Sequence, residues 1–202
     1  MKRGRLLVIS GPSGVGKTTA VTGVRNANPE MYFSVSATTR AMRPTDEEGV
    51  TYRFKTQEEF LKLVDEGYFY EHAEYSGNLY GTPKTPVEEH LAAGEDVILD
   101  IEVQGGLQVK AQTPEAILIF LVAPSWGELE RRLRSRGDTS EEDIQKRLKQ
   151  ARWEYTQAEQ YDYIVVSEAP PECVVERINT ILSAEGYRTR RNMNLLNLEE
   201  SL

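Results

Sequence analysis

A glycine-rich segment near the start of the chain has the residue spacing of a phosphate-binding loop. It reads Gly11-x-x-x-x-Gly16-Lys17-Thr18. Glycines let successive backbone N–H groups turn toward one anion, and a helix beginning directly afterwards adds its positive end. At this spacing Lys17 reaches the β- and γ-phosphates of a nucleotide, and the Thr18 hydroxyl can ligate Mg²⁺. The sequence therefore predicts a nucleoside triphosphate site formed by Gly11, Pro12, Ser13, Gly14, Val15, Gly16, Lys17, Thr18 and Thr19.

Asp100 is a second candidate for phosphate chemistry. It follows the apolar run at residues 97–99, which reads as a buried strand. An acidic residue at a strand end often lies near the metal of such sites. The same residue could instead cap the following helix. Both interpretations remain open for Asp100.

Short apolar runs alternate with helical patterns along most of the chain. The runs at residues 6–9, 97–99, 116–122 and 163–166 read as strands, and residues 18–26, 104–112, 125–136, 140–160 and 170–185 read as helices. Strands that alternate with helices predict an α/β fold, in which a parallel core sheet is flanked by helices. This arrangement places the phosphate-binding loop between the first strand and the first helix.

Residues 33–82 break that alternation. Strand-like pieces at 33–36, 51–54 and 69–75 surround a helix near 57–66, which predicts an inserted subdomain of mixed strands. After residue 188, Leu195, Leu198 and Leu202 recur at helical spacing, so the tail either docks as a last amphipathic helix or frays. We expect one domain over residues 1–187, comprising a core (1–32, 83–124 and 162–187), the inserted subdomain (33–82) and a lid (125–161), followed by a tail (188–202).

Composition narrows the class of protein. The chain has 202 residues, 39% of them hydrophobic, which suffices for one domain with its own core. The net charge of −8 argues against a nucleic-acid partner. No apolar run reaches the roughly 18 residues of a membrane span, and the first residues do not resemble a signal peptide. The single cysteine, Cys173, is typical of a reducing, cytoplasmic setting, and we expect it to be buried.

One segment carries the opposite charge to the rest of the chain. The segment from Arg131 to Arg152 contains eight basic and four acidic residues, which gives it a local charge of +4. Such a segment is usually a solvated helix face with ion pairs between neighbouring turns. Alternatively, it neutralises a highly anionic ligand. A GTPase is not indicated, because the chain has no Asn-Lys-x-Asp motif for reading guanine.

Several separate motifs together resemble the guanylate kinase family, whose members phosphorylate GMP with ATP. Besides the loop, they are Ser34-Val35-Ser36-Ala37-Thr38-Thr39-Arg40-Ala41-Met42-Arg43-Pro44, Gly49-Val50-Thr51-Tyr52-Arg53-Phe54, Phe69-Tyr70-Glu71, Tyr75-Ser76-Gly77-Asn78-Leu79-Tyr80-Gly81-Thr82, Ile98-Leu99-Asp100-Ile101-Glu102-Val103-Gln104-Gly105, Arg132-Leu133-Arg134-Ser135-Arg136-Gly137 and Lys146-Arg147-Leu148. The resemblance extends from about Leu6 to about Tyr187. It implies a P-loop nucleoside monophosphate kinase fold with an inserted GMP-binding subdomain and a helical lid.

The resemblance also implies residue roles. Arg40, Arg43, Tyr52 and Tyr80 would hold the GMP phosphate, and Ser36, Glu71 and Thr82 would contact guanine, with Asp100 nearby. Gly81 would also belong to the substrate-binding residues. Lys17, Arg43 and the lid arginines Arg132, Arg136 and Arg147 would be catalytic, Thr18 would bind the metal, and ATP with Mg²⁺ would supply the phosphoryl group. The implied acceptors are GMP and dGMP. Glu102 departs from the family pattern, in which Asp is frequent at this position.

The residues themselves are consistent with these roles. A phosphate monoester has a second pKa near about 6, so GMP needs no general base, and neither His72 nor His90 lies in the motifs. Guanine offers two adjacent N–H donors that one carboxylate accepts together, and Glu71 is the carboxylate available in the segments assigned to base reading. Two alternatives are a non-catalytic guanylate-kinase-like interaction module and another small-molecule kinase. The complete loop and lid arginines disfavour the first, and Glu71 disfavours the second. The sequence does not determine an oligomeric state.

Overall fold

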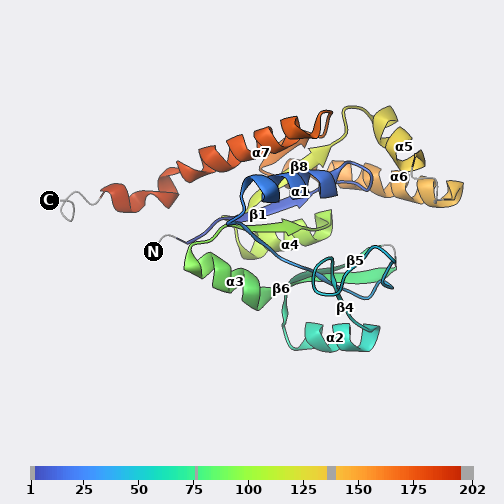
Figure 1. The fold of residues 1–202 in the computed structure, drawn as a ribbon, viewed down its shortest axis with the longest axis horizontal. Coiled ribbons are helices and arrows are strands. Elements are labelled where there is room, and N and C mark those ends of the chain that lie inside the picture. The colour runs from blue at the N-terminus through green and yellow to red at the C-terminus, as the bar shows by residue number, and fades with distance from the viewer. Residues whose placement is uncertain (1–2, 76, 136–139, 197–202) are drawn as a thin grey trace.

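The computed structural model describes residues 3–75, 77–135 and 140–196 (Figure 1). A parallel core sheet has the strand order β2-β7-β1-β8-β9, and a smaller mixed sheet has the order β4-β3-β6-β5. The core strands are β1 (Leu6–Ser10), β2 (Tyr32–Phe33), β7 (Val97–Asp100), β8 (Ile117–Val122) and β9 (Tyr163–Val166). The α/β class predicted from the alternation of strands and helices is confirmed.

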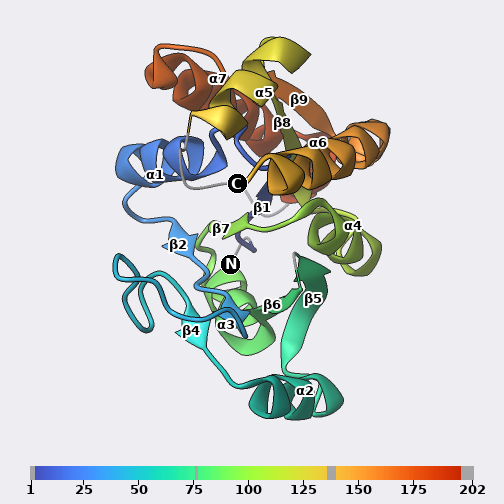
Figure 2. The same cartoon turned by 90° about the vertical axis from the view of Figure 1, so that its right-hand side faces the viewer.

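The helices cover both faces of the core sheet because its strands alternate side chains between two cores. Leu7 and Ile9 of β1 pack on one face with α1 (Lys17–Ala27), α7 (Pro171–Gly186), α5 (Trp126–Arg134) and α6 (Glu141–Thr156). Leu6 and Val8 pack on the other face with α3 (Lys84–Ala93) and α4 (Val103–Gln112). Figure 2 shows these two layers on either side of the sheet, with the mixed sheet beyond α3 and α4.

The mixed sheet is formed by β3 (Ala37–Thr38), β4 (Arg53–Phe54), β5 (Phe69–Tyr75) and β6 (Asn78–Pro83). Helix α2 (Gln57–Asp65) closes its small core by burying Phe60 against Phe69, and it begins with a complete capping box at Thr56. Such a box satisfies two backbone donors that a helix start leaves unpaired. Phe33 lies in the core sheet, in strand β2, so the mixed sheet begins after it.

Several details differ from the sequence-based expectations. Strand β6 and helix α3 were not predicted. The helix expected over 140–160 ends at Thr156 and is followed by the 3-10 turn η1 (Ala158–Gln160). Cys173 is partly exposed and not buried. Among the described residues, no helix is long and apolar enough to cross a membrane.

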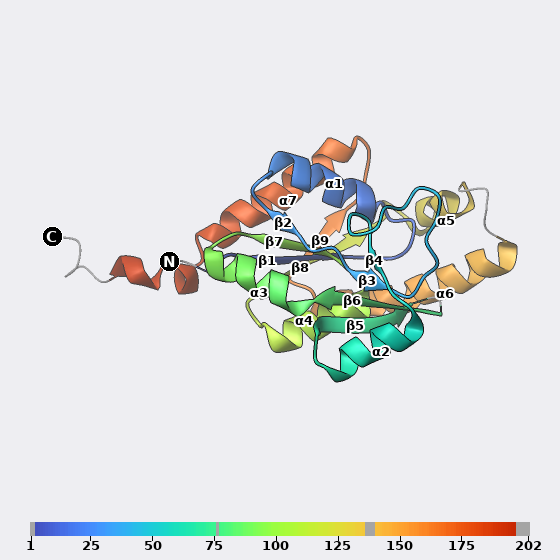
Figure 3. The ribbon, with the colours of Figure 1, turned by 60° about the horizontal axis from the view of Figure 1, so that its bottom comes forward.

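The end of the described chain forms two short 3-10 turns, η2 (Thr189–Arg191) and η3 (Met193–Leu196). They project from the end of α7, away from the two sheets (Figure 1, Figure 3). Leu195 is exposed, so it does not pack as part of a docked amphipathic helix. Leu198 and Leu202 lie outside the described residues.

Candidate active site

The phosphate-binding loop connects β1 to α1, as its spacing predicts. Gly16 stands at the start of α1 with φ at 103°, in the left-handed region that favours glycine. A Cβ atom at Gly16 would also lie 2.7 Å from the Ser167 hydroxyl oxygen. Gly16 is therefore required both for the turn and for the close approach of the loop to the end of β9. The loop leaves the N-terminal end of α1 open toward the cleft that it lines.

Lys17 lies among acceptors from the segment that follows β7. Its ammonium is 3.3 Å from a carboxylate oxygen of Asp100 and 3.3 Å from one of Glu102, and it donates to the Ile101 carbonyl at 3.3 Å. Burial opposes the charge of Lys17, but Glu102 and Asp100 outweigh it and raise the pKa of Lys17 above its ordinary value. Lys17 is thus held as a cation at the mouth of the loop.

The side chain of Asp100 contacts Lys17, and the N-cap position of α4 is occupied by Glu102, whose side chain makes no capping bond. Asp100 therefore does not cap helix α4. Glu102 is a residue that the sequence analysis left without a role. Its position two residues after Asp100, the last residue of β7, could have indicated a role in the site.

Glu71 is a buried carboxylate at the other side of the cleft. It is 4% exposed, and Thr82, opposite it in the β5–β6 ladder, donates its hydroxyl to a Glu71 carboxylate oxygen at 2.7 Å. Burial raises the pKa of Glu71 to about 7, although the bonds from Thr82 oppose the shift. The structure therefore places the Thr82 hydroxyl against Glu71, whereas the resemblance implied that both residues contact guanine.

Arg40, Tyr52 and Tyr80 also meet in this cleft. Arg40 lies over the Tyr52 ring, 5.2 Å from its centre, and Tyr52 packs edge-on against Tyr80 with ring centres 5.9 Å apart. Arg40 forms an ion pair with Asp46 at 2.9 Å, and the backbone N–H of Arg43 donates to the same carboxylate. Asp46 lies in an exposed loop whose sequence gave no signal of this contact.

The expected site residues separate into those that line the cleft and those behind it. Lining residues are Gly11, Pro12, Ser13, Gly14, Gly16, Lys17, Thr18, Thr19, Ser36, Arg40, Arg43, Tyr52, Glu71, Tyr80, Asp100 and Arg147, around a volume of about 730 Å³. Gly81, Thr82, Val15 and Arg132 are not among the lining residues. Gly81 and Thr82 stand in β6, and Thr82 reaches the cleft only through Glu71.

The arginines of the basic segment, residues 131–152, fall into two groups: some form a solvated helix face, and others contact the phosphate-binding loop. Arg131 and Arg134 form ion pairs with acidic residues of α5 and α6, as a solvated helix face does. Arg132 instead donates to the carbonyl oxygen of Val15 at 2.9 Å, and Arg147 donates to the Ser13 hydroxyl at 3.2 Å. Two arginines of this segment therefore touch the phosphate-binding loop. Arg136 lies outside the described residues.

Glu154 was not predicted as a site residue. It belongs to the buried face of α6 together with Ile144, Leu148 and Ala151. Burial, with the nearby charge of Glu102, raises the pKa of Glu154 to about 7, and one of its carboxylate oxygens has no hydrogen-bond partner among the residues that the structure describes. A glutamate at a position that helical spacing assigns to the core was the available signal.

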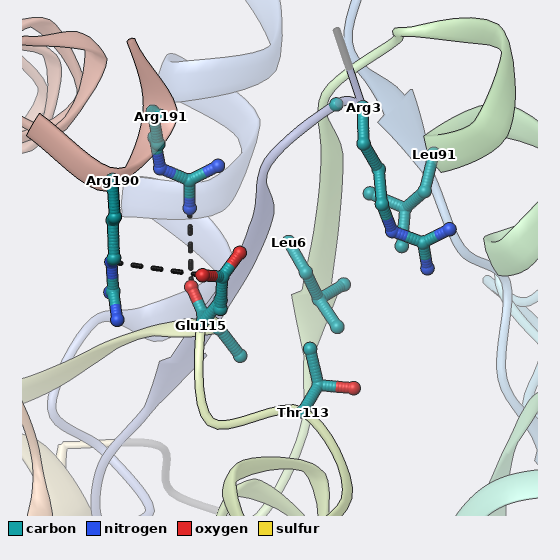
Figure 4. Close-up of a pocket in the computed structure, with 9 residues that line it drawn as sticks. Arg3, Leu6, Leu91, Thr113, Glu115, Arg190 and Arg191 are labelled. Atoms are coloured by element: carbon teal, nitrogen blue, oxygen red, sulfur yellow. Dashed lines mark hydrogen bonds and ion pairs between the residues drawn. The ribbon is translucent and has the colours of Figure 1, made fainter. Parts of the chain in front are cut away.

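No cluster of three metal-ligating side chains occurs within the described ranges. A second cavity of about 230 Å³ lies where β1 begins, at the opposite end of the core sheet (Figure 4). Arg190 and Arg191 stand on one side of it, and Arg191 donates to the Glu115 carbonyl at 3.2 Å. The residues expected to do chemistry gather in the larger cleft between the two sheets.

Comparison with known proteins identifies the family. The guanylate kinase profile matches residues 3–185. A guanylate kinase of Thermus thermophilus is 51% identical over 94% of this chain and 85% of its own, and that of Desulfitobacterium hafniense is 46% identical over 93% and 94%. The crystal structure of guanylate kinase from Anaplasma phagocytophilum superposes with a TM-score of 0.78 at 37% identity, covering 94% of this chain and 90% of that one. The chain belongs to the guanylate kinase family.

Proposed function

We propose that this chain transfers the γ-phosphoryl group of ATP to GMP, and to dGMP, giving ADP and GDP or dGDP. The observation that supports this most is the pairing of two sites in one cleft. A phosphate-binding loop with a permanently charged Lys17 faces a wall that contains the buried carboxylate Glu71. The first suits a triphosphate, and the second suits a base with two adjacent N–H donors.

At the loop, residues 11–19 bind the triphosphate of ATP through backbone N–H groups and the positive end of α1. Lys17 binds the β- and γ-phosphates. Arg147, which already contacts Ser13, lies where it can neutralise the transferred group, and Arg136 acts with it. The Arg132 guanidinium donates hydrogen bonds to the Val15 and Ser167 carbonyls, and so it stabilises the conformation of the loop as the lid closes.

The residues present fit a magnesium ion of the kind that accompanies ATP. Mg²⁺ keeps several waters and takes only one or two protein ligands besides phosphate oxygens, so it needs no side-chain cage. The Thr18 hydroxyl, which lines the cleft beside Lys17, is the protein ligand that we assign to it. When bound, the ion neutralises charge on the β- and γ-phosphates.

At the opposite wall, Arg40, Arg43, Tyr52 and Tyr80 bind the phosphate of GMP. Glu71 accepts the N1–H and exocyclic amine of guanine, while Thr82 holds the carboxylate. The remaining base and phosphate contacts come from Ser36 and Asp100, which line the cleft, and Gly81 supports the wall from β6. Adenine offers no such donor pair, so the same wall disfavours AMP.

The chemistry requires alignment more than acid–base help. An oxygen of the GMP phosphate forms a new bond to the γ-phosphorus of ATP. The bond from that phosphorus to the oxygen that bridges the β- and γ-phosphates breaks, and its electron pair leaves with ADP. The two anionic groups repel each other, and Lys17, Arg43, Arg136 and Arg147 offset that repulsion. In this proposal residues 33–82 form the GMP-binding part and residues 125–161 the lid, which closes over the core and excludes water.

A coupled assay of ADP release tests the proposal. With ATP as donor and GMP, dGMP, AMP and CMP as acceptors in separate reactions, we expect turnover with GMP and dGMP and little with AMP or CMP. Equal turnover with AMP would contradict the base assignment. No turnover with any acceptor would contradict phosphoryl transfer and favour an interaction module.

A further inference from the structure

Helix α4 presents one face to strand β5 at the point where Glu71 stands. Gly105, Gln108 and Gln112 are spaced three and four residues apart, so they lie along the same side of the helix. The helix and the strand lie side by side in two views (Figure 2, Figure 3). We call these three residues the α4 face.

Gly105 lies directly against the Glu71 carboxylate. A Cβ atom at position 105 would be 2.3 Å from Oε2 of Glu71 and 2.8 Å from its carboxyl carbon. A side chain at position 105 would therefore displace the Glu71 carboxylate from its observed position. Glycine is an unfavourable choice inside a helix, where alanine is favoured, so its presence here requires a local reason. The space needed by the Glu71 carboxylate is that reason.

Gln108 and Gln112 hold the strand on either side of Glu71. Gln108 donates its amide to the His72 carbonyl at 2.8 Å and accepts the His72 backbone N–H at 3.3 Å. Gln112 donates to the Tyr70 carbonyl at 2.6 Å. Strand β5 is the last strand of the mixed sheet, so these backbone groups face no strand partner. The two glutamines replace the missing strand and fix β5 against α4.

The carboxylate is thus bounded by two elements, β6 and α4. Thr82 holds Oε1 from the neighbouring strand β6, and Gly105 lets the helix backbone approach Oε2. We propose that the α4 face is a specificity determinant of this enzyme, which sets the position at which Glu71 meets the two N–H donors of guanine. The inference rests on the proposed function, since it concerns how that base-reading residue is placed.

The same helix begins next to the groups that hold Lys17. Ile101 and Glu102, which contact the Lys17 ammonium, directly precede α4. A short continuous segment therefore touches the phosphate-binding loop at its start and the base-reading wall at Gly105. Both N–H donors of guanine must align with the Glu71 carboxylate at the same time. A small displacement of this segment therefore changes base specificity more than it changes turnover.

Gly105→Ala with GMP and IMP as acceptors is the first test. IMP keeps the N1–H donor of GMP but lacks the exocyclic amine, so the ratio of kcat/KM for GMP over IMP reports the placement of the carboxylate. A misplacement of about 1 Å can lower kcat/KM by roughly 100-fold. We expect the ratio to fall by about tenfold or more, with KM for ATP within about twofold of the parent. The matched control is Gly127→Ala in α5, where the nearest atom is 4.0 Å away, and it should leave the ratio unchanged.

The same substitution on a Glu71→Asp background separates placement from a general effect on folding. Aspartate withdraws the carboxylate by one methylene and makes room for the alanine methyl group. Gly105→Ala should then change KM for GMP by less than about twofold, against about tenfold or more in the parent. A loss of equal size on both backgrounds would overturn the inference, because the clash with Glu71 would not be its cause.

Gln108→Ala keeps the inference testable if Gly105→Ala does not fold. It removes both bonds to His72 without introducing a clash, and we expect the GMP-to-IMP ratio to fall by a few-fold. If Glu71→Gln lowers the ratio while Gly105→Ala and Gln108→Ala leave it unchanged, the α4 face plays no part in specificity and the proposed function stands. If Glu71→Gln also leaves the ratio unchanged, Glu71 does not read the base, and the proposed base assignment fails together with the inference.

Discussion

The phosphate-binding loop and the wall around Glu71 line the same cleft, but they are built in different ways. The loop is one continuous segment, whose backbone turn at Gly16 and helix start at Lys17 are formed by residues next to one another in the chain. The wall combines Glu71 of β5, Thr82 of β6 and Gly105 of α4, which come together only through tertiary packing. The backbone of a locally built site depends less on distant residues than an assembled site, which depends on each of its supporting elements.

This contrast predicts different consequences of substitution. Changes in the loop should remove interactions with charge that develops in the transition state, and so lower kcat. Changes in the wall should alter which base is accepted and at what concentration, and so act on KM for GMP. Kinetic measurements on substitutions in each region therefore test this division between kcat and KM.

The largest effect is expected from Lys17→Ala. Removing one positioned charge from a site of phosphoryl transfer lowers kcat by about 100- to 1,000-fold. The coupled assay at saturating ATP and GMP gives kcat, and circular dichroism checks that the fold is intact. Activity within twofold of the parent would contradict the role of Lys17 in catalysis.

Arg147→Ala should have the next largest effect, a loss in kcat of roughly 10- to 100-fold with little change in KM for GMP. Arg136→Ala should behave in the same way. Arg131→Ala is the matched control, because Arg131 is exposed and pairs with Glu128 in the same basic segment. Equal losses for Arg131 and Arg147 would show that the segment acts through its total charge and not through contact with the loop.

The pH dependence of KM for GMP probes the wall. Burial raises the pKa of Glu71 to about 7, so below pH 7 the carboxylate is increasingly protonated and must lose its proton to accept two N–H groups. We expect KM for GMP to rise by up to about tenfold for each unit of pH below 7. The GMP phosphate titrates near about 6 and Glu154 near about 7, so Glu71→Gln is the control that removes the titration of Glu71 and retains these two. A parent profile identical to that of the variant would contradict this assignment.

The sequence predicted the locally formed parts of the molecule better than the parts assembled from distant segments. Residues 11–19 and the alternation of apolar strands with helices are local patterns, so the loop and the core sheet were predicted close to their observed bounds. Strand β6 was missed because it contains Gly81 and ends in Pro83, both of which are disfavoured in strands. Helix α3 was missed because Pro86 weakens its helical pattern.

The tertiary contacts of the site were beyond a reading of local pattern. Nothing in the residues around Gly105 indicates that its backbone approaches Glu71, 34 positions earlier in the chain. The contacts of Asp46 with the Arg40 side chain and the Arg43 backbone likewise depend on how an irregular loop folds. The burial of Glu154 could have been inferred from helical spacing, whereas its proximity to Glu102 required the folded chain.

The smallest effect is expected from Thr82→Val, which keeps the volume of Thr82 but removes the hydroxyl that donates to Glu71. Losing a hydrogen bond to a charged group costs about 1.5 to 3 kcal/mol, and a water that took the place of the hydroxyl would offset part of it. We therefore expect KM for GMP to rise by about threefold to tenfold while kcat and KM for ATP stay near the parent values. Thr82→Ser, which keeps the donor, should restore KM for GMP. A fall in kcat without a change in KM would place Thr82 outside base recognition.

Glu71→Gln shows whether Glu71 reads the base, because it replaces one acceptor oxygen by an amide that faces the donors of guanine and leaves the size of the side chain unchanged. The measurement is kcat/KM for GMP and for AMP, for parent and variant, at constant ATP and at pH 8, where the parent carboxylate is ionised. A site that hydrogen-bonds a substrate group can reject an analogue lacking it by about 10⁴-fold, so we expect the preference for GMP over AMP to fall by about 100-fold or more. KM for ATP should change little. An unchanged preference would show that Glu71 does not read the base, and it would contradict the assignment of guanine to this wall.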